Sequence, residues 1–526
     1  MKAEPILSFL PLAAFLPMAT PTGLSAQDKG ADHRLNIVHI MTDDHSFQTI
    51  SAYGHPISAL APTPNIDRLA AQGIVFNRAY VENSLSTPSR ACLMTGLYSH
   101  QNGQTMLDNV MDSTVTFIPE LLHAAGYQTA VIGKWHMQCD PKGFDTYMVL
   151  RGQGPYYRPG FKTPETNGKY VAEEGYTTEQ ITKHALEFLE NRDTDKPFCL
   201  YVHHKAPHRS WDPAIKYLEL YEDITFPLPE TFYDDYSTRG AAMQEQRMRI
   251  DENMNMDRDL KVVGWPGNRP GAELPPAGMP EDQQAIWYES YNRRNKELFD
   301  NYENMTHEEF VEWKYQRYLK DYLRVIRSVD DSVGEILDYL EENGLMENTV
   351  IVYTSDQGFY MGEHGWFDKR FMFEESYRTP LIVRYPGNAG NTKSEAYVQN
   401  IDFGPTYLDI AGVKQLKDMH GKSIVPILKK DGKEPVFWRK YMYYHFYDHT
   451  DEHNVMRHDG ISTKRYKLIH FYDETGVIPS YEEFYDLQAD PKELVNAIDK
   501  PQYKRIVRKF YRKLDKMRAR LGVEEY

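Results

Sequence analysis

Short apolar runs alternate with segments of helical periodicity over most of the chain. The runs that we expect to form buried strands are residues 36–41, 74–80, 129–132, 198–202 and 349–353. Apolar side chains recur at helical spacing over 178–191 and 317–342, and a further helix is expected to begin at Thr63-Pro64. This alternation predicts an α/β fold with a mostly parallel sheet flanked by helices.

The composition and periodicity of the sequence change in two places. Residues 209–315 are polar, rich in Met and Tyr and weakly periodic, so we expect an insertion of loops and short helices. After Pro426 the chain becomes aromatic-rich strand material and ends in a basic amphipathic helix over 505–520. We therefore predict a domain boundary near residue 430.

The N-terminal segment, residues 1–26, has the pattern of an export signal. Lys2 precedes an apolar stretch from Ile6 to Leu16, and the segment closes with small residues at Ser25-Ala26. The apolar stretch is too short to cross a bilayer core of about 30 Å, which disfavours a membrane anchor. No other segment is apolar for long enough to span a membrane, so we expect a periplasmic or secreted protein.

Composition narrows the function. The 526 residues include 60 Lys and Arg against 76 Asp and Glu, a net charge of −16, which disfavours nucleic acid as a partner. An apolar fraction of 41% allows a sizeable core. The three cysteines, Cys92, Cys139 and Cys199, permit at most one disulfide, and we interpret each as a small buried apolar residue.

Ionisable residues follow directly after the predicted strands, except the one at 74–80. The clusters at these strand ends are Asp43-Asp44-His45, Lys134-Trp135-His136, His203 to His208, and Asp356-Gln357 with Lys369 further on. Because the ligand crevice of an α/β sheet lies at the carboxyl ends of its strands, we expect these clusters to meet in one crevice.

An all-oxygen donor set stands out among these residues. Asp43, Asp44 and Asp356, with the amide of Gln357, suit a hard divalent cation such as Ca²⁺. Aspartate pairs at strand ends can instead simply cap the next helix. Three aspartates crowded together without a cation would repel one another, so the metal interpretation requires that they converge.

The segment Ser86-Thr87-Pro88-Ser89-Arg90, followed by Thr95-Gly96, predicts a helix start, with Ser86 in the cap position just before the helix N-terminus. The free N–H groups and the dipole at such a helix start favour an anion, and Arg90 is near enough to pair with one. Taken alone, this is an ordinary capping pattern.

The segment from Ser86 to Arg90 resembles the signature of the type I sulfatases, which read Cys or Ser, any residue, Pro, Ser, Arg. Segments 36–44, 133–136, 207–208 and 355–369 resemble the family's metal-binding, Gly-Lys-x-His, Pro-His and sulfate-binding segments in the same order. The resemblance implies an alkaline-phosphatase-like catalytic domain over 27–430 and a smaller antiparallel α+β domain over 431–526.

The family's chemistry then implies roles for individual residues. Ser86 would be the precursor of formylglycine (3-oxoalanine), installed before export by a maturating radical S-adenosylmethionine enzyme. A hydrated aldehyde has two hydroxyls, so one can attack the sulfur and deprotonation of the other can release the sulfate. The residues that would bind Ca²⁺ are Asp43, Asp44, Ser86, Asp356 and Gln357. Gln357 departs from the family, which most often has Asn there.

The remaining catalytic residues would act on the sulfate and on the leaving group. Arg90, Lys134 and Lys369 would hold the sulfate oxygens as charge builds on them. His136 would orient or deprotonate the hydrated aldehyde, and His208 would protonate the departing sugar oxygen.

The segments outside this shared core resemble the bacterial N-acetylglucosamine-6-sulfatases. These segments are residues 152–159, 204–211, 363–370, 453–458 and 465–472. The resemblance implies exo-acting removal of 6-O-sulfate from N-acetylglucosamine in a sulfated glycan of heparan or mucin type. Asp368 and Arg370 are candidates for binding sugar hydroxyls, although either could form a surface salt bridge, and His458 would reach the crevice from the second domain.

Three alternatives stay open. The enzyme could act on another sulfated sugar or an aryl sulfate, or it could be a phosphoesterase of the same superfamily with two transition metals. A glycan-binding module with an unmodified Ser86 is the alternative from another class.

The net charge does not decide between these alternatives, because a bound Ca²⁺ with Lys134 and Lys369 would reverse the local field within a Debye length of about 8 Å. We interpret the basic run 505–520 as a solvated helix face.

Overall fold

The computed structural model describes Met1, residues 34–266 and residues 274–526. Apart from Met1, the predicted export signal at 1–26 therefore lies outside the described residues. None of the described helices is long and apolar enough to cross a membrane.

The core of the molecule is a ten-stranded mixed sheet with the strand order β11-β2-β10-β9-β1-β8-β4-β5-β6-β7. Its central strands β9, β1, β8 and β4 run parallel to one another. The strands of this sheet are β1 (Asn36–Thr42), β2 (Ile74–Phe76), β4 (Gln128–Gly133), β5 (Thr146–Leu150), β6 (Gly160–Lys162), β7 (Val171–Ala172), β8 (Phe198–His203), β9 (Thr349–Ser355), β10 (Leu381–Arg384) and β11 (Thr392–Ser394).

The register of the central strands brings their carboxyl ends to one level. Thr42 pairs with Ser355 of β9, Met41 pairs with His203 of β8, and His203 pairs with Gly133 of β4. The residues that follow these strands therefore begin side by side at one edge of the sheet. Four of the five predicted strands are confirmed within one or two residues.

The single strand predicted over 74–80 is wrong. The chain forms β2 in the main sheet and then β3 (Ala79–Tyr80), which pairs with β12 (Val398–Gln399) in a separate small sheet. The break falls at Asn77 and Arg78, whose side chains both bind the carboxylate of Glu395, at 2.6 and 2.7 Å. One strand was predicted because the residues on both sides of this bend are apolar, so that the sequence reads as one continuous run.

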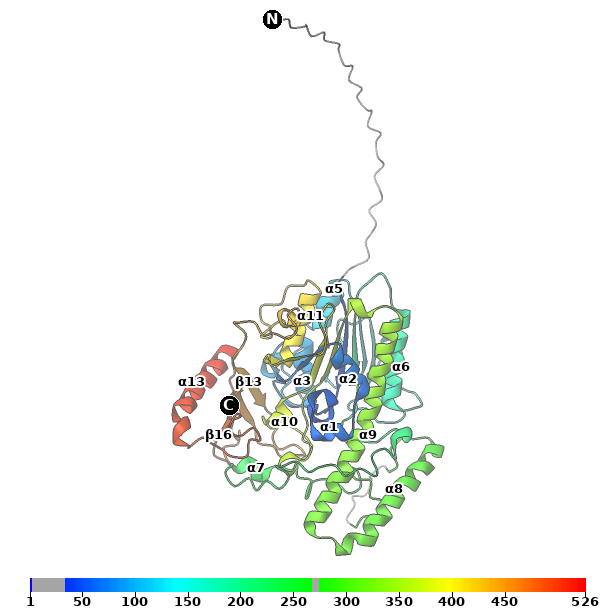
Figure 1. Ribbon diagram of the computed structural model, residues 1–526, viewed down its shortest axis with the longest axis vertical. Coiled ribbons are helices and arrows are strands. Elements are labelled where there is room, and N and C mark those ends of the chain that lie inside the picture. The colour runs from blue at the N-terminus through cyan, green and yellow to red at the C-terminus, as the bar shows by residue number, and fades with distance from the viewer. Residues whose placement is uncertain (2–33, 267–273) are drawn as a thin grey trace.

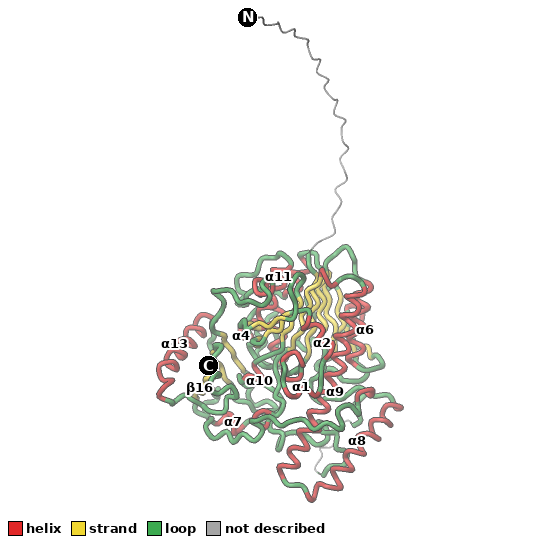
Figure 2. Tube along the Cα trace, in the orientation of Figure 1, coloured by secondary structure: helices red, strands yellow, loops and turns green. Residues whose placement is uncertain are grey.

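Helices cover both faces of the sheet (Figures 1 and 2). Val38 and Ile40 of β1 pack with α2 (Pro64–Ala71), α6 (Thr177–Asn191) and α9 (His307–Glu342). Ile37 and Met41 point to the opposite core, which includes α3 (Ser86–Thr95), α5 (Ile118–Ala124) and α11 (Phe403–Ile410). A strand buried on both faces explains why the sequence shows a continuous apolar run there.

The prediction of loops and short helices over 209–315 is partly wrong. This region contains the long helix α8 (Glu281–Asn301), which lies beside the N-terminal half of α9 (Figure 1). Trp287, Tyr291 and Leu298 form its sparse buried stripe, which is too thin to give a clear periodicity. α9 begins at His307, earlier than predicted, because Thr306 and Glu309 form a capping box at its start.

The remaining α-helices of the described residues are short. They are α1 (Pro56–Leu60), α4 (Ser99–Asn102), α7 (Ala241–Glu245), α10 (Glu374–Tyr377) and α12 (Val425–Leu428).

The C-terminal part forms a four-stranded antiparallel sheet covered by one helix. The strands are β13 (Met442–Phe446), β14 (His458–Ser462), β15 (Tyr466–Phe471) and β16 (Tyr481–Asp486). α13 (Lys504–Leu521) packs Phe510 and Leu514 against this sheet and exposes most of its basic residues, whereas Arg518 is buried and donates from Nε to Asp459 of β14 at 2.7 Å. The boundary near residue 430 stays a prediction.

The cysteines form no disulfide in the described residues. Cys92, Cys139 and Cys199 are all free thiols; Cys92 and Cys199 are buried and Cys139 is half-buried.

Asp330 of α9 should stabilise the start of α2. Its carboxylate accepts hydrogen bonds from the backbone N–H groups of Asn65 and Ile66, at 3.0 and 2.9 Å, in place of a side-chain cap from Thr63. We expect Asp330→Ala to lower the free energy of unfolding by about 1–3 kcal/mol, because buried donors lose a charged acceptor. Thermal unfolding measures this loss. Asp338→Asn, which removes an exposed ion pair with Arg68, should cost less than about 1 kcal/mol, and equal losses in the two variants would contradict the assignment.

Candidate active site

The residues after β1, β9 and β4 meet at the carboxyl edge of the sheet. The backbone N–H of Asp44 donates to Asp356 Oδ1 at 3.1 Å, and Lys134 forms an ion pair with Asp43. All four of these side chains are fully buried or nearly so. The convergence that the metal interpretation required is therefore present.

Ser86 lies in the middle of this cluster. It is the first residue of α3, one position later than the cap position that we predicted, and Leu85 is the cap. Its hydroxyl donates to Asp43 Oδ1 at 2.8 Å, and the residue is 2% exposed. The start of α3 is also bonded to the segment that follows β4, because Thr87 Oγ1 donates to the carbonyl of His136 at 2.8 Å.

Each carboxylate of the cluster has a cationic partner. Lys369 Nζ lies 2.7 and 2.8 Å from the two oxygens of Asp44, and Arg90 donates to Asp356 Oδ2 from Nε at 3.1 Å. Lys134 is the partner of Asp43. The three cations keep a dense group of buried acids together.

The acids still differ in how readily they ionise. Burial raises the pKa of Asp44 to about 7, with Lys369 acting in the opposite direction, and burial with the nearby Asp43 raises the pKa of Asp356 to about 6. Burial also acts to raise the pKa of Asp43, but Lys134 and the other cations hold it well below its usual range. The protein's own cations therefore do not fully compensate the three carboxylates.

The donor set fits a hard divalent cation. Gln357 Oε1 is buried and has no hydrogen-bond partner among the described residues, while its Nε2 donates to Asp44. A buried amide oxygen without a partner beside three carboxylates is a ligand set of the kind that Ca²⁺ prefers. Side-chain atoms of Asp43, Asp44 and His208 also lie within 4.8 Å of one another. Because an imidazole is a poor ligand for a hard cation, we favour the oxygen set over one that includes His208.

Two histidines border the cluster. His136 Nδ1 lies 3.2 Å from Thr87 Oγ1, and burial together with Lys134 lowers its pKa to about 2. His208 lies with Nε2 3.8 Å from Asp44 Oδ2, and its Nδ1 is 2.7 Å from the carbonyl of Arg209. Burial lowers the pKa of His208 well below its ordinary value. In this structure both rings are therefore neutral.

The comparisons with known proteins decide the family. The model of the family described as "Sulfatase" matches residues 35–413, and that described as "N-sulphoglucosamine sulphohydrolase, C-terminal" matches residues 362–520. The chain belongs to the sulfatase family. The resemblance seen in the sequence is thus confirmed, and the protein is a sulfuric ester hydrolase.

Individual relatives agree with the family match. The chain is 45% identical over 514 residues to an N-acetylglucosamine-6-O-sulfatase of Bacteroides thetaiotaomicron, covering 96% of this chain and 89% of the relative. A solved structure in complex with its substrate, D-glucosamine-2-N,6-O-disulfate, matches with a TM-score of 0.87 and 43% identity over 94% of this chain and 99% of that one. A phosphonate monoester hydrolase from Silicibacter pomeroyi shares the fold alone, with a TM-score of 0.69 and 19% identity over 93% and 96% of the two chains. The predicted fold class is confirmed.

Arg90 lies in the site on α3, with protein partners that the sequence did not show. Its Nε and Nη2 face Asp356, and its Nη1 donates to the carbonyl of Lys134 at 2.8 Å. The guanidinium therefore orients a carboxylate and a strand end, while its buried Nη2 has no hydrogen-bond partner among the described residues. The expected contact of Arg90 with the sulfate oxygens stays a prediction, and the motif gave the residue's place on the helix but not these partners.

The prediction that His458 reaches the crevice is also wrong. His458 is fully buried in β14, where its Nδ1 bonds the carbonyl of Met456 at 2.9 Å and its Nε2 accepts from the N–H of Met372 at 3.2 Å. Its ring stacks on Tyr444 and Phe446. With both nitrogens bonded and aromatic rings around it, His458 holds the C-terminal sheet against the catalytic domain.

His453 is the histidine that reaches the site from the C-terminal part. Its Nε2 lies 3.3 Å from Asp368 Oδ2, and Asp368 also pairs with Arg370. Asp451 holds Arg370 in turn, through Nε at 2.9 Å and Nη2 at 2.7 Å. The sequence pointed to the segment 453–458, but nothing in it showed which histidine faced the catalytic domain.

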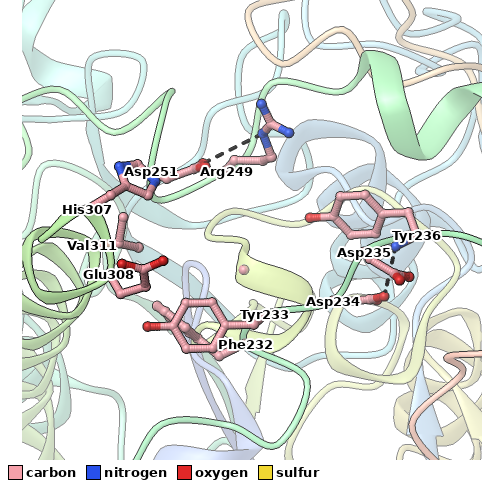
Figure 3. A pocket seen from close by; sticks show the side chains of 11 residues that line it. Phe232, Tyr233, Asp234, Asp235, Tyr236, Arg249, Asp251, His307, Glu308 and Val311 are labelled. Atoms are coloured by element: carbon pink, nitrogen blue, oxygen red, sulfur yellow. Dashed lines mark hydrogen bonds and ion pairs between the residues drawn. The ribbon is translucent and has the colours of Figure 1, made fainter.

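Two cavities adjoin the cluster. One of about 370 Å³ includes Gln153, Tyr156, Lys205 and His208 in its wall. Another of about 250 Å³ lies beside His136. The cavity in Figure 3, about 290 Å³, lies between the first turns of α9 and residues 232–236, and none of the predicted site residues lines it.

Asp451 should control substrate binding through Arg370. We expect Asp451→Asn to raise KM roughly 10-fold with little change in kcat, because Arg370 loses a charged partner that fixes its position. Steady-state kinetics on a sulfated sugar measures this split. The exposed Asp499→Asn should leave both constants unchanged, and a fall in kcat with constant KM in Asp451→Asn would contradict the role of Arg370 in binding.

Proposed function

We propose that this sulfatase removes the 6-O-sulfate from N-acetylglucosamine at the ends of sulfated glycans of heparan or mucin type. The observation that carries the proposal is the 45% identity, over 96% of this chain and 89% of the relative, to a protein named N-acetylglucosamine-6-O-sulfatase. The geometry supports it, because Ser86, three carboxylates and two lysines form one compact site that can hold a sulfate ester.

Asp43, Asp44, Asp356, Gln357 and the side chain derived from Ser86 would hold Ca²⁺ in this proposal. When bound, the cation would polarise the sulfate oxygens and offset the charge of the carboxylates. The partnerless Gln357 Oε1 supports its role as a ligand, although the family most often has Asn there.

Ser86 is in our proposal converted to formylglycine by a maturating radical S-adenosylmethionine enzyme. The hydrated aldehyde supplies a nucleophilic hydroxyl and a second hydroxyl whose deprotonation releases the sulfate. In support, the Ser86 side chain lies against Asp43 at the start of α3, where free N–H groups favour negative charge.

The remaining residues divide between charge stabilisation and proton transfer. Lys134, Lys369 and Arg90 hold the sulfate oxygens as negative charge builds, and Asp356 and the Lys134 carbonyl fix the Arg90 guanidinium in place. His136 orients or deprotonates the hydrated aldehyde. His208 protonates the departing sugar oxygen, and the nearby sulfate charge favours its protonated form.

The sugar itself is bound by the group next to Lys369. Asp368 and Arg370 are proposed to bind sugar hydroxyls, and His453 fixes Asp368. In our proposal the terminal sugar then lies between the predicted catalytic domain (27–430) and the predicted C-terminal domain (431–526). We further propose that the segment 1–26 exports the protein, so that it acts in the periplasm or outside the cell.

Conversion of Ser86 can be tested directly. Mass spectrometry of the Ser86 peptide, from a host that has the maturating enzyme, should show the loss of two hydrogen atoms. Ser86→Ala should lower kcat/KM roughly 10³-fold or more, because it removes the nucleophile. The exposed Ser113→Ala should retain activity, and a fully active enzyme with an unmodified Ser86 would contradict the mechanism.

A panel of sulfated monosaccharides tests the substrate. We expect kcat/KM for N-acetylglucosamine-6-sulfate to exceed that for its 3-sulfate isomer and for a 2-O-sulfated uronate roughly 100-fold or more, because buried polar groups that lose their partners discriminate strongly. Sulfate release measured with matured enzyme, and with Ser86→Ala as the blank, gives these values. A preference for the uronate would overturn the proposed substrate but not the sulfatase chemistry.

A further inference from the structure

Lys205 is a buried cation in the wall of the cavity next to His208. It follows β8 and is 5% exposed. Its ammonium lies 4.3 Å from the centre of the Tyr156 ring, and its hydrogen bond goes to the carbonyl of Arg209 at 3.4 Å. This contact is long for a hydrogen bond.

The ammonium of Lys205 forms no ion pair with a carboxylate of the described residues, whereas the other charges nearby are paired. Arg209 binds both oxygens of Asp259 at 2.7 Å and also Glu452. Asp212 accepts from Ser210 Oγ at 2.6 Å. Lys205 is thus a cation that the fold has desolvated without placing a carboxylate in contact with it; Asp43, Asp44 and Asp212 act on it only from beyond ion-pair distance. Such an arrangement is costly unless a ligand offsets it.

The cavity gives such a ligand access to Lys205. It has a volume of about 370 Å³, and the half-exposed Arg258 adds a second positive charge to its wall. Burial, with Lys134 as the second cause, lowers the pKa of Lys205 to about 8, so the side chain is still mostly charged at neutral pH. His208, on the same wall, is the residue that we place beside the departing sugar oxygen.

We propose that Lys205 binds a second anionic group of the substrate, either an N-sulfate on the same glucosamine or the carboxylate of a neighbouring uronate. This inference rests on the proposed function, since it assumes that the 6-O-sulfate occupies the site at Ser86. Lys205 is then a specificity residue, distinct from the lysines that hold the reacting sulfate.

Two substrate pairs separate the two sources of negative charge. The first pair is N-acetylglucosamine-6-sulfate and N-sulfoglucosamine-6-sulfate. The second pair is a disaccharide that carries a uronate next to the sulfated sugar and the same disaccharide with the carboxylate reduced to an alcohol. The variants are Lys205→Met, which keeps the apolar stem, Lys205→Arg, which keeps the charge, and the exposed Lys500→Gln as a charge-matched control.

In one of the two pairs, we expect Lys205→Met to raise KM roughly 10- to 100-fold for the member that carries the second negative group, relative to the member that lacks it. The reason is that a charge-assisted contact is lost. kcat on that anionic substrate should change much less than KM. Lys205→Arg should restore part of the preference, and Lys500→Gln should behave as the unmodified enzyme does.

Equal losses by Lys205→Met on both members of both pairs would show a merely structural role and overturn the inference. An unchanged ratio in both pairs would overturn it as well, while leaving the proposed function intact. No sulfate release from any of the four substrates by the unmodified, matured enzyme would overturn the proposed function and the inference together.

Discussion

The site depends on three aspartate carboxylates that the sheet forces together. Asp43 and Asp44 continue from β1 and Asp356 continues from β9, and the two strands end level because Thr42 pairs with Ser355. Burial at this edge raises the pKa of Asp44 and of Asp356. Like charges this close are tolerated only if positive charge lies among them, so the lysines, Arg90 and the proposed Ca²⁺ follow from the same constraint.

The same edge explains why an acidic protein can bind an anion. The net charge of −16 describes the whole surface, whereas the substrate meets Lys134, Lys369 and, in our proposal, Ca²⁺ at short range. Lys205 extends this positive field along the adjacent cavity. The net charge acts on long-range steering of the ligand, whereas the local field decides which ligand binds.

Much of this arrangement could be predicted from the sequence, because strand ends are marked by residue type. The apolar runs ended at Asp43, Lys134 and Asp356, and parallel strands place such ends at one edge. The sequence could not show the bend at Asn77, because the partner that stabilises it, Glu395, lies far along the chain. The helix α8 was not predicted because too few of its residues are buried and apolar to give a clear helical periodicity.

The orientation of individual side chains was the least predictable part. Arg90 and His458 lie on the predicted elements, but tertiary partners turn the first toward Asp356 and enclose the second in aromatic rings. His453 could not be distinguished from His458 without the packing of the C-terminal sheet on the catalytic domain. Motifs therefore gave the residue types of the site, and long-range contacts decided which of them face the substrate.

The most direct test of this account is the effect of Ca²⁺ on thermal unfolding of metal-free protein. We predict that Ca²⁺ raises the unfolding midpoint, by the equivalent of about 2.7 kcal/mol at one hundred times its dissociation constant. The shift should vanish in Asp44→Asn. An unfolding midpoint that Ca²⁺ does not change, together with full activity in EDTA, would contradict the claim that the crowded carboxylates are organised around a cation.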